Sequence, residues 1–320
     1  MVPGGSGFCY TLTMQTWEQL FGADVVVVDG GLSTQLTRLG QDISGTLWTG
    51  RALLTDPGAV TRAHADYLDA GADVVITASY QVSRRGFVSA GLSAADADAA
   101  LAASVAAARA AVGSTGRGAR VAASVGPYGA ILHDGSEYRG NYGLTRGQLV
   151  DFHRERLDVL LAAEPDLLAI ETIPDVREAE ALMEVLAGVD VPAWLTFSAV
   201  EGGLTCAGQS IEEAAAVAAS SPTVVATGIN CTDPRLVTDL VARIRSAVDL
   251  PIVVYPNAGG TWDAGDGEWH GGVPVDASDA FPEAVLDAWQ AAGASAIGGC
   301  CGTDAATISH VARQLHRPAR

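Results

Sequence analysis

Positively charged residues are scarce in this sequence, and long apolar runs are absent. The 320 residues include 19 Lys and Arg against 37 Asp and Glu, which gives a net charge of -18. An acidic surface attracts neither nucleic acid nor an anionic membrane, so we expect neither as a partner. No apolar run is long enough to span a bilayer. The opening residues MVPGGSGFCYTLTMQ lack the basic and apolar regions of a signal peptide, so we expect a cytoplasmic protein.

Cysteine is also rare, and its distribution is uneven. Five cysteines in a chain of this length are too few for a disulfide framework. Cys9 and Cys206 stand alone, whereas Cys231 closes the segment ATGINC, and Cys300 and Cys301 are neighbours in IGGCCGT. A lone cysteine is more often a small buried hydrophobe than a metal ligand. Cys231, Cys300 and Cys301 are therefore considered together.

Eight apolar, β-branched runs recur along the chain and are separated by alanine-rich stretches. They cover residues 25–30, 73–79, 120–127, 167–173, 193–199, 224–230, 251–257 and 295–300. Each run is almost continuously hydrophobic rather than alternating, which is typical of parallel strands that are covered on both faces.

The intervening stretches show helical spacing. Apolar residues recur every three or four positions in residues 93–113 and 145–164. Residues 233–248 begin with an Asp–Pro pair that suits a helix start, and Gly71 and Gly293 are placed to end helices.

Eight strand–helix units in series predict a single-domain α/β protein with a (β/α)8 TIM barrel fold. We expect this domain to cover residues 16–320 and residues 1–15 to form an extended or disordered segment. A doubly wound open sheet is the alternative fold. It is disfavoured because DGGLSTQL, after the first strand, lacks the G-x-G-x-x-G spacing of a nucleotide-binding loop.

Polar residues gather at the carboxyl ends of the predicted strands. In a closed barrel these ends converge on one rim, where the active sites of this fold lie. The residues in question are Asp29, Thr77, Ser79, Glu171, Asn230, Cys231, Asn257, Cys300 and Cys301.

Cys231, Cys300 and Cys301 would form a three-thiolate metal site on this rim. The glycines that flank the adjacent pair allow a bend that turns both sulfurs to one point, and adjacent cysteines rarely form a disulfide with each other. Soft thiolates in tetrahedral geometry favour a single zinc ion, and an iron–sulfur cluster fits the cysteine spacing less well. Three protein ligands leave one position open, as in catalytic zinc sites.

The charge of such a ligand set favours one kind of chemistry. Three thiolates make zinc a weak Lewis acid toward water or a carbonyl, but the ion still lowers the pKa of an incoming thiol. Alkyl transfer to sulfur therefore fits better than hydrolysis. A zinc hydrolase and a non-catalytic zinc-storage or redox-sensing protein are the alternatives.

Seven segments together resemble the homocysteine S-methyltransferase family over residues 24–313. In chain order they are DGGLSTQL, ADVVITASYQVS, SVGPYGAILHDGSEYRGNYG, AIETIPDVREAEAL, TGINC, VYPNAGGTWD and GGCCGT. The resemblance implies a (β/α)8 barrel, zinc on Cys231, Cys300 and Cys301, and an amino group of homocysteine held by Asp29 and Glu171. It is greatest to the branch that uses S-methylmethionine or S-adenosylmethionine, and less to the branch that uses betaine. A related thiol or selenol, such as selenocysteine, is the alternative acceptor.

Further site residues are weaker candidates, each with a packing role as the alternative. Thr77 and Ser79 could donate hydrogen bonds to the substrate carboxylate, and Asn257 could orient the substrate. Aromatic faces and carboxylates stabilise a sulfonium cation, so the candidates for donor binding are Tyr80, Tyr128, Glu137 and Trp262.

The expected reaction needs no protein nucleophile. The thiolate of homocysteine attacks the sulfonium methyl in line and gives methionine and a neutral thioether. A general acid is unnecessary because the leaving group is neutral, and alignment supplies much of the rate.

Overall fold

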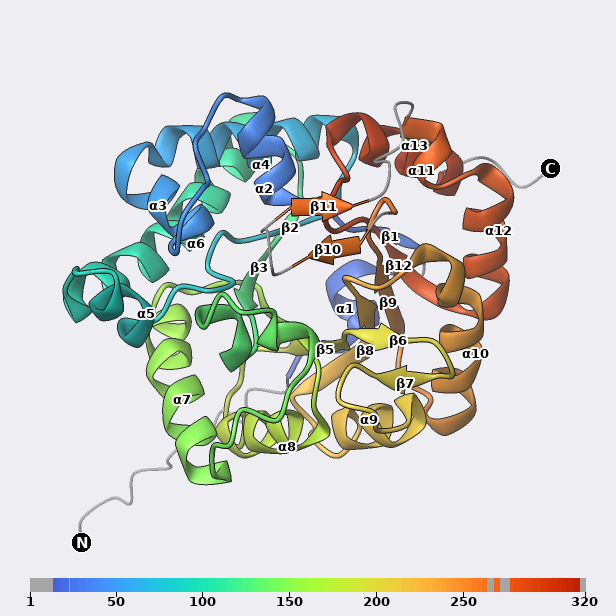
Figure 1. The fold of residues 1–320 in the computed structure, drawn as a ribbon. Coiled ribbons are helices and arrows are strands. Elements are labelled where there is room, and N and C mark those ends of the chain that lie inside the picture. The colour runs from blue at the N-terminus through green and yellow to red at the C-terminus, as the bar shows by residue number, and fades with distance from the viewer. Residues whose placement is uncertain (1–13, 23, 260, 264–267, 271–276, 317–320) are drawn as a thin grey trace, which may run out of the picture.

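A closed ring of eight parallel strands forms the centre of the molecule (Figure 1). The computed structural model describes residues 14–22, 24–259, 261–263, 268–270 and 277–316. The expected segment 1–15 lies outside the described residues except for Met14 and Gln15, which precede the first helix. The barrel strands are β1 Val26–Val27, β2 Val74–Ile76, β3 Arg120–Val125, β4 Leu167–Ile173, β5 Ala193–Phe197, β8 Val224–Asn230, β9 Ile252–Tyr255 and β12 Ala294–Ile297.

The order of these strands decides between the two expected folds. Neighbours in the sheet run β1-β12-β9-β8-β5-β4-β3-β2, and every pairing within it is parallel. A parallel bridge between Val28 and Val74 then joins the first strand to the second and closes the ring. The (β/α)8 barrel is confirmed, and the open doubly wound sheet is excluded.

Helices surround the ring (Figure 1). They are α1 Trp17–Phe21, α2 Leu32–Arg38, α3 Trp48–Thr55, α4 Pro57–Ala70, α5 Arg84–Ser89, α6 Ala94–Thr115, α7 Arg146–Ala162, α8 Val176–Val185, α9 Ile211–Ala218, α10 Val237–Ala247, α11 Ala277–Ala280, α12 Glu283–Ala292 and α13 Ala305–Leu315, with the 3-10 turns η1 Tyr128–Ile131, η2 Ser136–Tyr138 and η3 Pro234–Leu236. None of the described helices is both long enough and apolar enough to cross a bilayer.

Capping residues place several helix ends where the sequence predicts them. Gly71 and Gly293 follow α4 and α12 with φ of 111° and 110°, the left-handed conformation that glycine adopts freely. Asp233 caps η3 rather than α10, because the Asp–Pro start first forms a 3-10 turn before the α-helix begins at Val237.

Two hydrophobic layers stabilise the barrel. The inner layer draws side chains from all eight strands, from Val26 in β1 to Ala296 in β12, and includes Trp17 of α1. The outer layer lies between the strands and the surrounding helices. Leu20 and Phe21 of α1 lie beside the starts of β1, β2 and β3, so this short helix covers the amino ends of the strands.

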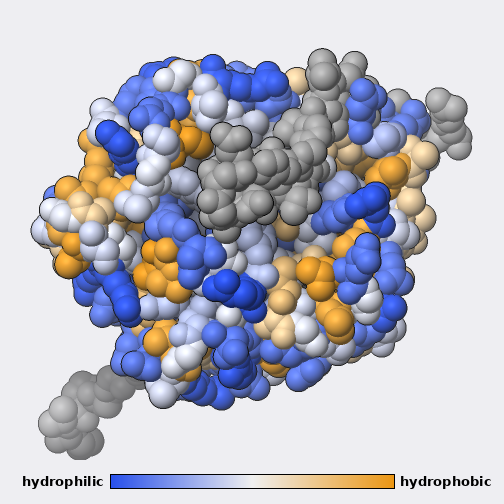
Figure 2. Space-filling view, in the orientation of Figure 1, coloured by the Kyte–Doolittle hydropathy of each residue, from blue (hydrophilic) through white to orange (hydrophobic). Residues whose placement is uncertain are grey.

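The carboxyl ends of the strands carry additional structure. Two short hairpins, β6 Ala199–Val200 with β7 Leu204–Thr205 and β10 Thr261–Asp263 with β11 Glu268–His270, follow β5 and β9. On the space-filling view of this face, hydrophobic residues form small separate groups among hydrophilic ones (Figure 2).

Candidate active site at the carboxyl ends of the strands

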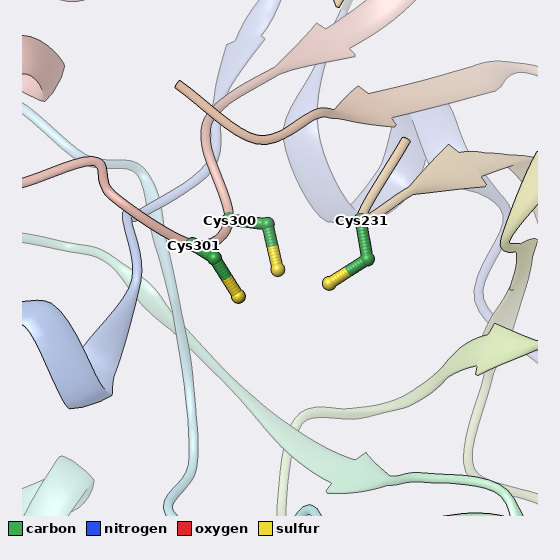
Figure 3. Close-up of side chains that lie close together, drawn as sticks. All are labelled: Cys231, Cys300 and Cys301. Atoms are coloured by element: carbon green, nitrogen blue, oxygen red, sulfur yellow. The ribbon is translucent and has the colours of Figure 1, made fainter. Parts of the chain in front are cut away.

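Three cysteine sulfurs meet at the rim of the barrel (Figure 3). The Sγ atoms of Cys231, Cys300 and Cys301 all lie within 4.8 Å of one another. The first comes from the end of β8 and the other two from the loop after β12. The convergence that the sequence predicts for these three residues is therefore present.

The backbone conformation of Cys231 and the hydrogen bonds of its neighbour Asn230 set the position of Cys231. Its φ is 47°, a left-handed conformation that is uncommon for a residue with a side chain. The preceding Asn230 accepts hydrogen bonds from the Thr172 N–H at 2.7 Å and the Thr196 hydroxyl at 2.8 Å, and donates to the Thr172 hydroxyl at 2.7 Å. Asn230 thus ties the ends of β4, β5 and β8 together directly beside the first cysteine.

Backbone contacts hold the other two cysteines. The Cys300 N–H donates to the Pro256 carbonyl at 2.8 Å, and the Cys301 N–H donates to the Asn257 side-chain oxygen at 3.2 Å. Gly302 follows with φ of 79°. A Cβ at Gly31 would lie 2.4 Å from the Cys300 carbonyl oxygen, so only glycine allows the turn after β1 to approach this loop.

Hydrogen bonds among the thiols separate their acidities. The thiols of Cys300 and Cys301 donate to the Cys231 sulfur, which brings the pKa of Cys231 well below its usual value despite burial. The same hydrogen bonds, together with burial, raise the pKa values of Cys300 and Cys301. The Tyr138 hydroxyl also hydrogen-bonds to Cys231.

The cysteines line a cavity of about 610 Å³ together with residues from most strand ends. Of the other site residues predicted from the sequence, Asp29, Thr77, Tyr80, Glu137 and Glu171 line it. Eight of the residues predicted from the sequence, the three cysteines included, therefore line one cavity at the carboxyl ends of the strands.

Three carboxyl groups in this cavity are buried. Asp29, Glu137 and Glu171 are 1%, 6% and 7% exposed. None of the three has an ion-pair partner within the described ranges, and Arg38, the one cation among the described lining residues, pairs with Asp304 at 2.6 Å. The cavity is therefore acidic and has no internal cation to neutralise these groups.

Burial raises the pKa of each of these acids. For Asp29 the pKa is well above its usual value because of burial and the nearby Glu171 carboxylate, despite a 2.8 Å hydrogen bond from the Ile76 N–H. Burial raises the pKa of Glu171 to about 7, and hydrogen bonds from Ser124 and Tyr255 offset part of the effect. The pKa of Glu137 is also about 7, again mainly through burial.

An irregularity in β4 presents Glu171 to the cavity. The pairing of β4 with β5 shifts register between Ile170 and Ile173, and Thr172 has φ of 61°. Such a bulge turns a side chain out of the regular alternation of the strand.

Three other candidates lie outside this lining, and the side chain of a fourth is not among those that the structure describes. The Ser79 hydroxyl contacts Thr77 at 2.7 Å and donates to the Ser124 carbonyl at 2.8 Å. Asn257 supports Cys301, as described above. Tyr128 packs against Tyr142, with ring centroids 5.3 Å apart. Trp262 lies in β10, but its side chain is outside the described part of the molecule.

Several lining residues were not among the sequence candidates. They include Arg38, Trp48, Gln81, Tyr138 and Tyr255. Gln81 and Tyr138 lie inside the segments ITASYQVS and DGSEYRG, next to the candidates Tyr80 and Glu137. Their position beside these candidates in the sequence could therefore have identified Gln81 and Tyr138 as cavity residues.

Comparisons with known proteins agree with this geometry. The family model for homocysteine S-methyltransferase matches residues 26–315. The chain belongs to this family. It is 45% identical over 304 residues to homocysteine S-methyltransferase 4 of Zea mays, covering 90% of this chain and 89% of that protein. It is 42% identical to homocysteine S-methyltransferase 3 of Arabidopsis thaliana, with coverages of 90% and 89%.

A solved member of the family has the same fold. The metallated form of the homocysteine methyltransferase MmuM from Escherichia coli matches with a TM-score of 0.81 at 37% identity, covering 91% of this chain and 96% of that one. The apo form of the same protein matches with a TM-score of 0.71. The chain is therefore a methyltransferase, which argues against the zinc hydrolase and the non-catalytic zinc or redox protein.

Proposed function

We propose that the chain is a zinc-dependent homocysteine S-methyltransferase that takes its methyl group from a sulfonium donor, preferably S-methylmethionine and otherwise S-adenosylmethionine. The observation that carries this proposal is the composition of the cavity. Three sulfurs and three buried carboxyl groups line it, and the one described cation in its wall is already paired. Zinc, an ammonium group and a sulfonium group are the positive charges that such a cavity would bind.

The cysteines fit a zinc ion by ligand type and by spacing. A tetrahedral site with Zn–S bonds of about 2.3 Å places its sulfurs about 3.8 Å apart, and the three Sγ atoms lie within 4.8 Å of one another. When bound, one zinc per chain would lower the pKa of the acceptor thiol and keep its sulfur nucleophilic.

Asp29 and Glu171 would hold the ammonium group of homocysteine. A buried carboxylate is stabilised by a nearby cation, and the Glu171 carboxylate lies close enough to Asp29 to raise the pKa of Asp29. Thr77 faces the same cavity, where its hydroxyl would donate to the substrate carboxylate in place of its hydrogen bond to Ser79. Ser79 and Asn257 would act indirectly, through Thr77 and Cys301.

The sulfonium donor would occupy the part of the cavity near Tyr80 and Glu137. The Glu137 carboxylate offsets the positive charge, and the Tyr80 ring offers an aromatic face. Tyr128 would support this wall through its packing, and Trp262 is a further candidate for the aromatic contact.

Methyl transfer is complete in one displacement. A bond forms between the acceptor sulfur and the methyl carbon while the donor S–CH3 bond breaks, and its electron pair stays on the donor sulfur. The thiol proton leaves to solvent, and the donor becomes a neutral thioether. The residues above contribute by aligning the two sulfurs and the methyl group.

A donor panel tests this function. S-methylmethionine, S-adenosylmethionine and betaine are each supplied with homocysteine, with selenocysteine as a second acceptor and with zinc quantified in the same preparation. We expect methionine from the sulfonium donors, fastest from S-methylmethionine, and about one zinc per chain. Methyl transfer from betaine alone, or full activity in a zinc-free preparation, would contradict the proposal.

A further inference from the structure

Gln81 is a buried amide in the cavity wall whose polar atoms have no partner among the described residues. Its side chain lines the cavity and the residue is only 5% exposed. Within the described part of the chain, neither its amide oxygen nor its amide nitrogen makes a hydrogen bond. Buried amides in folded proteins are normally paired, by protein, water or ligand. The roles proposed above for the acceptor and the metal leave Gln81 unused.

The backbone on both sides of Gln81 is fixed. It lies in the turn between β2 and α5, where the Tyr80 carbonyl accepts from the Gly126 N–H at 3.1 Å and from the Arg156 guanidinium at 2.6 Å. The Val82 N–H donates to the Ser79 carbonyl at 3.0 Å. These bonds restrict the movement of the turn, so the backbone position from which the Gln81 side chain reaches the cavity is fixed ahead of binding.

Arg156 and Gly126 make further contacts that hold the turn carrying Gln81. Arg156 is 2% exposed, and its guanidinium also donates to the carbonyls of Ser79 at 3.2 Å and Gly126 at 2.9 Å. A Cβ at Gly126 would lie 2.6 Å from the Tyr80 ring. The turn that carries Gln81 is thus packed against the loop after β3 with no space between them.

An unpaired primary amide recognises a group that both donates and accepts hydrogen bonds. Its oxygen accepts from an ammonium, and its NH2 donates to a carboxylate. Glu137 adds a third atom that has no partner among the described residues, its Oε2, which accepts hydrogen bonds when the carboxyl group is ionised. Together the two residues offer two acceptors and one donor group, which match an α-amino-carboxylate with its cationic nitrogen.

We infer that Gln81, with Glu137, binds the α-amino-carboxylate end of the methyl donor and so selects amino-acid sulfoniums. This inference rests on the proposed function, in which Asp29 and Glu171 hold the corresponding end of homocysteine. A donor that lacks a free α-amino group cannot donate to the Gln81 oxygen. A trimethylammonium group has no N–H at all, and binding it here would leave that oxygen unpaired.

The test compares two methyl donors in the wild type and in Gln81→Met, with homocysteine as acceptor. Methionine has a similar length but no hydrogen-bonding amide. The donors are S-methylmethionine and trimethylsulfonium, which carries neither an amino nor a carboxylate group. We expect the ratio of kcat/KM for S-methylmethionine over trimethylsulfonium to fall about 10- to 100-fold in the variant, and the homocysteine KM to move much less.

Two further variants make the result decisive. Gln81→Leu also removes both hydrogen-bonding atoms, with a branched side chain in place of the amide, so the ratio should fall here too, and thermal melting shows that both variants are folded. Gln290→Met, in α12 away from the cavity, should keep the wild-type ratio. An unchanged ratio in both Gln81 variants, or a homocysteine KM that rises by the same factor, would overturn the inference. A wild type that uses neither donor would instead refute the proposed function.

Discussion

Acidic side chains lie at both ends of the barrel, and their surroundings differ. At the amino ends of the strands, Asp73 and Asp166 accept hydrogen bonds from the backbone of the neighbouring strand, at 2.8 Å from Val27 and 2.7 Å from Val121. Their side chains are 38% and 19% exposed, and Asp166 pairs with Arg109 at 2.7 Å. These carboxylates join strands to one another and keep their charge near water or a cation.

At the carboxyl ends, the carboxyl groups of Asp29, Glu137 and Glu171 are buried and have no cationic partner in the part of the chain described. Burying a charge without a partner is unfavourable and raises the pKa of a carboxyl group. The acids at the amino ends therefore stabilise the fold, whereas those at the carboxyl ends are the groups that, under the proposed function, bind cationic ligands. Changes at the carboxyl end should affect binding and catalysis, and changes at the amino end should affect stability.

The largest effect is expected at the cysteines. Cys300→Ala should remove zinc and lower methyl transfer by about 1000-fold or more, roughly 4 kcal/mol of transition-state stabilisation. Metal analysis and a methionine assay on the same preparation measure both.

Cys206→Ala is the matched control. Cys206 is a free cysteine that does not belong to the three-sulfur cluster. It should keep its zinc and its activity, and a Cys300→Ala protein that behaved like this control would exclude the cluster as the metal site.

Glu171→Gln tests the role of the buried carboxyl groups at the carboxyl ends of the strands. We expect the homocysteine KM to rise about 30-fold, about 2 kcal/mol, because a neutral amide no longer offsets the ammonium charge. Since the Glu171 pKa is about 7, the wild-type KM should also rise as the pH falls below 7, when the carboxylate becomes protonated. The variant should lose that dependence.

Steady-state kinetics from pH 6 to 8 measure both effects, and Glu180→Gln, on the exposed side of α8, is the control. A homocysteine KM that stayed at the wild-type value in Glu171→Gln would remove this carboxylate from the substrate site.

His64 is a buried polar group outside the cavity, and it should affect stability rather than binding. It is 0% exposed, and within the described ranges neither ring nitrogen has a partner. Burial lowers its pKa from 6.5 to about 4. Below pH 6.5 the unfolded chain therefore binds a proton at this histidine that the folded chain does not, and stability falls as the pH falls toward 4.

His64→Met should reduce that acid sensitivity. Between pH 6.5 and 5.5 the wild type should lose about 1 kcal/mol more unfolding free energy than the variant, as measured by urea unfolding at the two pH values. The same change at the exposed His316 is the control. Equal losses in wild type and His64→Met would show that this histidine has a partner in solution.

The smallest effect is expected at Asp166. Asp166→Asn keeps an acceptor for the Val121 N–H but loses the ion pair with Arg109, so the unfolding free energy should fall by about 0.5–1 kcal/mol. The kinetic constants for both substrates should remain at their wild-type values. A change in homocysteine KM as large as that of Glu171→Gln would show that the two ends of the barrel are not independent.

The sequence predicted the barrel and the cysteine site because both follow from local patterns. Eight continuous apolar runs identify the strands, and in a closed parallel ring their ends must meet. Cys231 and the Cys300–Cys301 pair could therefore be brought together without any coordinates. The hairpin β6–β7 was not predicted, because each of its strands has only two residues.

The roles of neighbouring polar residues depended on packing that the sequence does not display. Thr77 and Ser79 lie two positions apart, yet Thr77 lines the cavity while Ser79 bonds the Ser124 carbonyl. Tyr128 is placed against Tyr142 by the 3-10 turn η1. The proposed role of Gln81 could not be identified from the sequence, because whether its amide has a hydrogen-bond partner depends on all the residues packed around it.

X-ray absorption at the zinc edge of the purified protein would identify the atoms that bind the metal. We expect zinc with three sulfur ligands in the wild type, a fourth sulfur when homocysteine is added, and no bound zinc in Cys300→Ala. Zinc held by oxygen or nitrogen ligands, or a sulfur count that does not change with homocysteine, would contradict it.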